Sequence, residues 1–155
     1  MIHNFDFVKG FAPDVADILN LADCYLYLAR DPHGSILKAG SAIQLLTQHI
    51  IEKECLSPQP WISECHHKCI TFLQDKLALP KKVVEAMHHI RKKRNDAYYN
   101  NKASEYDIKV CMKKAHKILC WCIEHYNLGI TTEYVAPDND YKPFCDISKI
   151  AFFNC

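Results

Sequence analysis

The chain has little glycine, little net charge and no long apolar run. Its 155 residues include only four glycines, none of them clustered, so it has no glycine-rich phosphate-binding loop. A formal net charge of +1 carries no global signal for nucleic acid, so any basic signal has to be local. The longest apolar runs, Cys24 to Ala29 and Ile118 to Ile123, are far too short to cross a bilayer. We therefore expect no membrane association.

Cysteine, in contrast, is abundant, with nine residues in the chain. The first residues, Met1 to Asp6, do not form a basic and then apolar leader. Without a leader, an odd number of cysteines favours reduced thiols in a cytoplasm over a disulfide framework. The length fits one domain, and a composition that is 49% apolar and 24% charged is typical of a globular chain.

Apolar residues recur at helical spacing along most of the chain. A stripe from Val15 to Ala29 predicts a first helix over roughly residues 13–30. Asp31 and Pro32 end that helix and supply the N-cap and first residue of a second one, which reaches about Leu56. Leu21 and Leu28 widen the first stripe, so this helix should be covered on more than one side.

Three further helices are expected after the break at residues 57–60. A shorter helix has Cys69 and Leu73 on its apolar face, and a fourth has a stripe from Val83 to Ala97. Ser104 caps a fifth helix that closes near Gly129, and it should pack antiparallel to the fourth. The predicted fold is an all-α bundle of four to five helices over residues 1–129. Residues 130–155 form an irregular tail, within which 131–135 could be a short strand.

The most informative segment is residues 91–100, where four cations precede Asn-Asp-Ala-Tyr-Tyr-Asn. At 100° per residue, Arg94 lies on the apolar stripe, whereas Lys92 and Lys93 lie on the solvated face. Arg94 is either a phosphate clamp or a structural residue that caps carbonyls or pairs with a carboxylate such as Asp96 or Asp107. The sequence Tyr-Asn-Asn predicts that the helix ends at the tyrosines. The candidate nucleic-acid-binding residues are Lys92, Lys93, Arg94, Asn95, Tyr98 and Tyr99.

A second cluster, Cys65 to Cys69 with two histidines between, has the residue types of a zinc site. Tetrahedral zinc needs two more ligands, and Cys120 and Cys122 could supply them only where two helices meet. Cys122 already lies on a core stripe, so buried thiols and a surface histidine pair are favoured. We expect no metal and no cofactor. His116 is expected to be a hydrogen-bonded histidine of the core.

Four of these segments, in this order and spacing, resemble a small helical domain of unknown function. That domain is found at the N-terminus of type I restriction enzyme R subunits and also alone, and it belongs with the HEPN-like (higher eukaryotes and prokaryotes nucleotide-binding) bundles. The resemblance covers roughly residues 5–127. It is carried by Leu21 to Tyr27, by Asp31-Pro32 with Ser35 to Lys38, by Leu79-Pro80 with His89 to Ala97, and by Ala115 to Trp121.

The resemblance implies a helical bundle, often dimeric, that handles nucleic acid or serves antiviral defence. Many HEPN-like proteins are metal-independent RNases with an arginine and, a few residues later, a histidine. Arg94-Asn95 matches the start of that motif, but Tyr99 stands in the histidine position, and a phenol with a pKa near 10 is a poor general base. Gly40 and Gln44 lie where the family often has a polar pair on its second helix.

The resemblance and the residues together favour a non-catalytic accessory domain that binds nucleic acid or a nucleotide in a restriction or defence system. RNA or DNA, a second copy of the chain and a larger defence enzyme are the expected partners. A structural dimerisation module and a weak RNase remain the alternatives.

Overall fold

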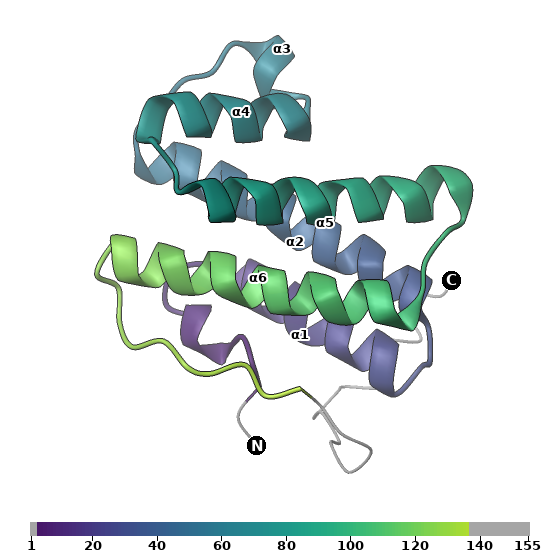
Figure 1. Cartoon of the computed structure of the whole chain (residues 1–155). Coiled ribbons are helices and arrows are strands. Elements are labelled where there is room, and N and C mark those ends of the chain that lie inside the picture. Colours follow the sequence, from purple (N-terminus) through teal and green to yellow (C-terminus); the bar gives the residue numbers. More distant parts are fainter. Residues whose placement is uncertain (1–2, 137–155) are drawn as a thin grey trace.

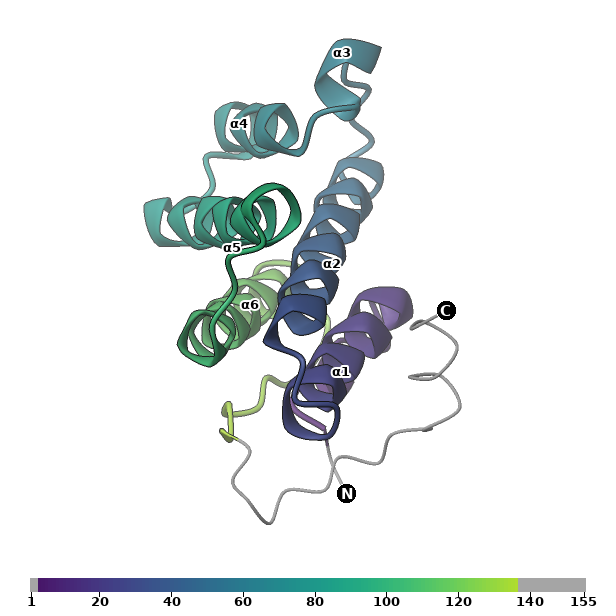
Figure 2. The ribbon, with the colours of Figure 1, turned by 90° about the vertical axis from the view of Figure 1, so that its right-hand side faces the viewer.

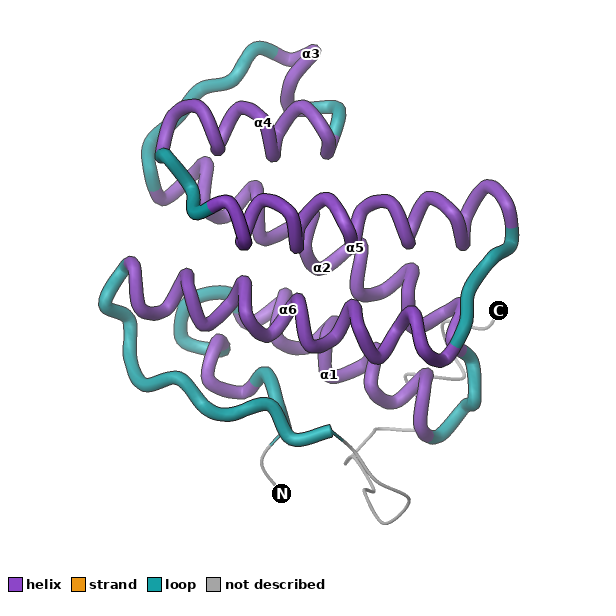
Figure 3. The backbone as a smooth tube through the Cα atoms, in the orientation of Figure 1, coloured by secondary structure: helices purple, strands orange, loops and turns teal. Residues whose placement is uncertain are grey.

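The computed structural model describes residues 3–136, and all regular structure within them is helical (Figures 1 and 3). The all-α prediction is therefore confirmed. The elements are the 3-10 turn η1 (Asp6–Val8) and the helices α1 (Pro13–Tyr27), α2 (Pro32–Lys53), α3 (Pro60–Ser63), α4 (His66–Leu77), α5 (Lys81–Asn100) and α6 (Glu105–His125). The four-residue α3 was not predicted, since it is too short to show a period.

The connection from α1 to α2 follows the sequence signals closely. α1 ends at Tyr27, a little earlier than expected, and Arg30 in the left-handed region (φ 53°) reverses the chain. The Asp31 carboxylate then accepts a hydrogen bond from the Gly34 amide at 2.9 Å, which satisfies an otherwise unpaired donor at the start of α2. The predicted N-cap is confirmed.

α2 is the central helix of the bundle, in contact with α1, α4, α5 and α6 (Figures 1 and 2). Its apolar residues, such as Ile43, Leu46 and Ile50, are completely buried. Gly40 lies where α5 crosses, and a Cβ atom at this position would overlap the side chain of Arg94. The close approach of α2 and α5 therefore depends on the absence of a side chain at Gly40.

α5 and α6 run antiparallel and side by side, as predicted (Figures 1 and 2). Asn101, in the left-handed region (φ 52°), ends α5, and the Ser104 hydroxyl accepts a hydrogen bond from the Asp107 amide at 3.1 Å to begin α6. An ion pair between Lys93 Nζ and Asp107 Oδ1, 3.0 Å long, joins the two helices near this turn.

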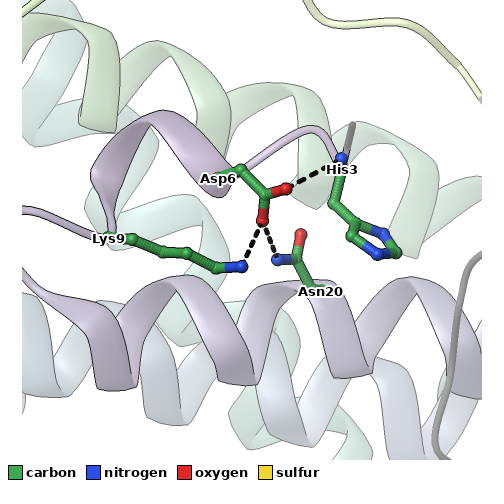
Figure 4. Close-up of polar contacts among 4 residues, drawn as sticks. All are labelled: His3, Asp6, Lys9 and Asn20. Atoms are coloured by element: carbon green, nitrogen blue, oxygen red, sulfur yellow. Dashed lines mark hydrogen bonds and ion pairs between the residues drawn. The ribbon is translucent and has the colours of Figure 1, made fainter. Parts of the chain in front are cut away.

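The N-terminal segment is attached to α1 through one carboxylate. Asp6 accepts hydrogen bonds from the His3 backbone N–H at 3.2 Å and from the Asn20 side chain at 3.1 Å, and it pairs with Lys9 at 2.9 Å (Figure 4). The contact with Asn20 joins η1 to the middle of α1, whereas those with His3 and Lys9 lie within the N-terminal segment.

Residues 130–136 return to this N-terminal segment. The Asn4 side chain donates to the Val135 carbonyl at 2.9 Å and accepts from the Val135 amide at 3.0 Å. Residues 131–135 do not form the strand that the sequence left open. The remainder of the expected tail, residues 137–155, lies outside the described residues.

Candidate functional site

The segment with the candidate residues lies wholly inside α5. The helix continues through both tyrosines to Asn100, so the prediction that it ends at the tyrosines was wrong. The left-handed residue that stops it is Asn101, a type that tolerates this conformation. Five residues rotate a helix by about 140°, so Tyr99 projects away from Arg94.

Arg94 is directed inward, toward α2. Its side chain lies over Gly40, and Nη1 donates a hydrogen bond to Gln44 Oε1 at 2.9 Å. The sequence had offered Asp96 or Asp107 as a structural partner, but the structure pairs Arg94 with the amide of Gln44. Gly40 and Gln44 of α2 therefore hold the Arg94 side chain in place.

Lys93 takes the position next to Asp107 that was considered for Arg94. Both side chains are partly buried at the α5–α6 contact. The hydrogen bond from Lys93 lowers the pKa of the Asp107 carboxyl despite the opposing effect of burial. The expectation that Lys93 lies on a solvated face was therefore wrong, whereas Lys92 is exposed as expected.

The remaining candidates form one outward surface. Lys92, Asn95 and Tyr99 follow each other at spacings of three and four residues and so share a face of the helix. Tyr98 lies beside Tyr99, with ring centroids 4.9 Å apart and ring planes at 82°. The tyrosines are 68% and 75% exposed. We call this surface, made of Lys92, Asn95, Tyr98 and Tyr99, the α5 outer face.

The cysteine and histidine residues considered for zinc belong to two elements, with Cys65 to Cys69 at the start of α4 and Cys120 and Cys122 on α6. Cys69 Sγ donates to the Ile62 carbonyl at 3.2 Å, and Cys122 is buried in the core, where burial raises its thiol pKa to about 12. Within residues 3–136, no group of three His, Cys, Asp or Glu side chains could hold a metal ion. Among the described residues, six thiols are free, those of Cys55, Cys65, Cys69, Cys111, Cys120 and Cys122.

His116 is the hydrogen-bonded core histidine that the sequence predicts. It is buried, its Nδ1 lies 3.5 Å from Cys120 Sγ, and the rings of Phe7 and Tyr134 pack on it at 5.2 Å and 5.6 Å.

Two buried ionisable groups, Asp23 and His66, were not predicted, and the surface histidine pair expected at residues 66 and 67 is wrong for His66. Asp23 is fully buried, and neither carboxylate oxygen has a hydrogen-bond partner among the described residues. Burial raises the pKa of Asp23 to about 7, and the nearby Asn4 side chain offsets part of this effect. His66 is also buried, and burial, followed by the charges of Arg94 and Arg91, lowers its pKa to about 4. An acidic residue inside an apolar stripe was the only available signal for Asp23.

Comparisons with known proteins do not identify the chain. No family model, no curated protein and no solved structure matches it. No helix of the described region is both long enough and apolar enough to span a membrane.

Proposed function

We propose that the α5 outer face binds single-stranded nucleic acid and that the protein does not cleave it. The observation that supports this most is the exposed tyrosine pair at the end of a basic segment. Two adjacent large aromatic rings in water are unusual unless they serve a partner, and bases stack on such rings whatever their sequence. The edge-to-face arrangement of Tyr98 and Tyr99 leaves ring surface open for stacking.

In this proposal, some of the cations next to the tyrosines contact the nucleic acid and others position the helix. Lys92 is exposed and can approach a phosphate, and the Asn95 amide can donate to a phosphate or a base edge. Lys93 and Arg94 are engaged by Asp107 and Gln44, so they position the helix. The resemblance to HEPN-like domains supports an accessory role in a restriction or antiviral defence system in the cytoplasm.

The absence of cleavage follows from proton chemistry. Cleavage through the 2′-hydroxyl of RNA needs a group that accepts its proton near neutral pH, and general acid–base help is typically worth about a hundred- to ten-thousandfold. Tyr99 is a phenol, and the helix turns it away from Arg94. Residual RNase activity is the weaker alternative.

A dimerisation module is the other candidate function, since the same exposed apolar residues could face a second copy. Leu28 at 43% exposure, together with Tyr98 and Tyr99, favours this alternative. It predicts a defined oligomer without salt-sensitive binding of RNA or DNA.

The test is fluorescence anisotropy with labelled single-stranded RNA and DNA at increasing salt. We expect binding that weakens steeply between about 50 and 200 mM salt, and a loss of at least about tenfold in affinity for the Tyr98→Ala/Tyr99→Ala variant. Trp61→Ala is the matched control, because Trp61 is also exposed, at 61%, but lies on α3. Equal affinities for the wild type and the double variant, or cleavage of the RNA that Arg94→Ala abolishes, would contradict the proposal.

A further inference from the structure

A depression of about 370 Å³ lies between α4 and α5, on the α4 side of the basic segment. Five of its six lining side chains carry nitrogen donors, and one is a carboxylate. They are His67, Glu85, His88, His89, Arg91 and Lys92. The sequence separates His67 from the others by some twenty residues, and only the packing of α4 on α5 brings it to them.

The two histidines that face each other across the helices define the centre of this depression. The rings of His67 and His88 lie 5.1 Å apart between centroids. Arg91 Nε donates to His88 Nδ1 at 3.4 Å, which leaves Nε2 of a neutral His88 as the nitrogen that carries the proton. His88 can therefore donate a hydrogen bond to a ligand even when it is uncharged.

We propose that this depression binds a phosphoryl group, held by His67, His88, Arg91 and Lys92. A phosphate offers several acceptor oxygens and a charge near −2, which matches a convergence of imidazole, guanidinium and ammonium donors. The site is separate from the α5 outer face except for Lys92, and it does not depend on stacking by the tyrosines.

The electrostatics of the depression support an anion over a cation. The pKa of His88 is lowered by burial and then by the positive charges of Arg91, His67 and Lys92. The pKa of His89 is lowered by burial and then by Lys114 of α6 and Lys93; Asp107 opposes this shift, and Lys92 adds the smallest contribution. Buried His66 of α4 adds another imidazole near Arg91. Burial disfavours any charge, but the coulombic contributions that follow it come mainly from cations, so a bound anion relieves their repulsion.

Binding of the anion and uptake of protons must therefore favour each other. An anion beside His88 raises the pKa of that imidazole, and by reciprocity a lower pH strengthens binding of the anion. Glu85 is the only carboxylate in the lining and opposes this effect. Its contact with Lys81, 3.7 Å long between two exposed side chains, contributes little to the fold.

The closing experiment is calorimetric titration of the full chain with inorganic pyrophosphate at about pH 6 and about pH 8. We expect binding that is several-fold tighter at the lower pH and at least about tenfold weaker in Arg91→Gln. Lys92→Gln, an exposed position that leaves the fold intact, should also weaken it, whereas Lys117→Gln, outside the lining, should not. Absence of pyrophosphate binding by the wild type would overturn the proposal. So would an affinity for pyrophosphate in Arg91→Gln and Lys92→Gln that equals the affinity of the wild type.

Glu85→Gln distinguishes an anion site from a metal site. Removal of the carboxylate should tighten pyrophosphate binding, whereas it would weaken a site for Zn²⁺. Binding of Zn²⁺ that displaces pyrophosphate and is lost in Glu85→Gln would overturn the proposal.

Matched oligonucleotides with and without a 5′-phosphate identify the source of the phosphoryl group. Tighter binding of the phosphorylated strand, lost in Arg91→Gln, would assign the site to a strand end. Equal binding of the two strands together with binding of pyrophosphate would assign it to a free ligand. Since pyrophosphate has no base, its binding is independent of Tyr98 and Tyr99, and the two sites fail separately.

Discussion

At the scale of single residues, Asp23 and His66 give the protein two buried groups with opposite responses to pH. Asp23 has its pKa raised from 3.8 to about 7, so the folded state holds this proton more tightly than the unfolded state does. Its contribution to the free energy of unfolding is complete below about pH 4 and is lost as the pH rises to about 7. His66, with its pKa lowered from 6.5 to about 4, loses its contribution as the pH falls through the same window.

We therefore predict that Asp23→Asn changes the pH dependence of stability. The free energy of unfolding of the variant minus that of the wild type should rise by on the order of 4 kcal/mol from about pH 4 to about pH 8. Each unit by which the pKa of Asp23 is raised contributes about 1.4 kcal/mol to this rise. The opposing slopes of Asp23 and His66 should partly cancel in the wild type, while the variant becomes more stable with rising pH. Urea titrations at several pH values measure this. Parallel curves for wild type and variant would show that Asp23 does not titrate in this window.

At the scale of elements, the helix starts were predictable and the contacts between helices were not. Asp31 and Ser104 cap helices through hydrogen bonds to residues three positions away, so the local sequence contains the whole signal. Lys93, and not Arg94, pairs with Asp107 because the rotation of α6 about its axis decides which cation it meets. That rotation is set by packing of the whole bundle, which the period of a single helix does not encode.

At the α2–α5 crossing, we predict that replacing a helical glycine by alanine lowers stability, the opposite of its usual effect. Gly→Ala inside a helix ordinarily stabilises by up to about 1 kcal/mol. Gly40→Ala should instead destabilise by about 1–3 kcal/mol, because the new methyl group overlaps Arg94 from its Cβ to its Cδ. In an Arg94→Ala background the same substitution should destabilise less, because the overlaps with Cγ and Cδ are removed and only the one with Cβ remains. A double-mutant cycle by thermal unfolding measures the coupling, and additive effects of the two changes would contradict the contact.

At the scale of the whole molecule, the sequence predicted the α-helical fold and the segment that carries the candidate site. It did not predict which residues of that segment face other helices and which face solvent. It placed six candidate residues together, whereas tertiary packing turns Lys93 toward α6 and Arg94 toward α2 and leaves the α5 outer face to solvent. The α4–α5 depression could not be predicted from the sequence for the same reason, since His67 contacts His88 only through the packing of α4 on α5.

The dimerisation alternative predicts a homodimer with the segment Arg94 to Tyr99 near its seam, where Tyr98 and Tyr99 would be covered and closed to nucleic acid. The prediction rests on the exposed apolar surface at Leu28, Tyr98 and Tyr99 and on the pairing that the HEPN-like resemblance implies. Light scattering at micromolar concentration should give twice the mass of 17.9 kDa for the chain. Tyr98→Ala/Tyr99→Ala should lower this mass if the seam includes the tyrosines. A monomeric wild type would count against the dimer and leave the nucleic-acid surface unaffected.

The central claim is that nucleic acid binds on the α5 outer face, and mapping of backbone amide shifts by NMR tests it most directly. On addition of a short single-stranded RNA, the largest shifts should fall on Lys92, Asn95, Tyr98 and Tyr99, and they should shrink as salt is raised. Amides of α1, which does not contribute to this face, should stay unchanged. No shifts at all, or shifts confined to α1 and the N-terminal segment, would contradict the account.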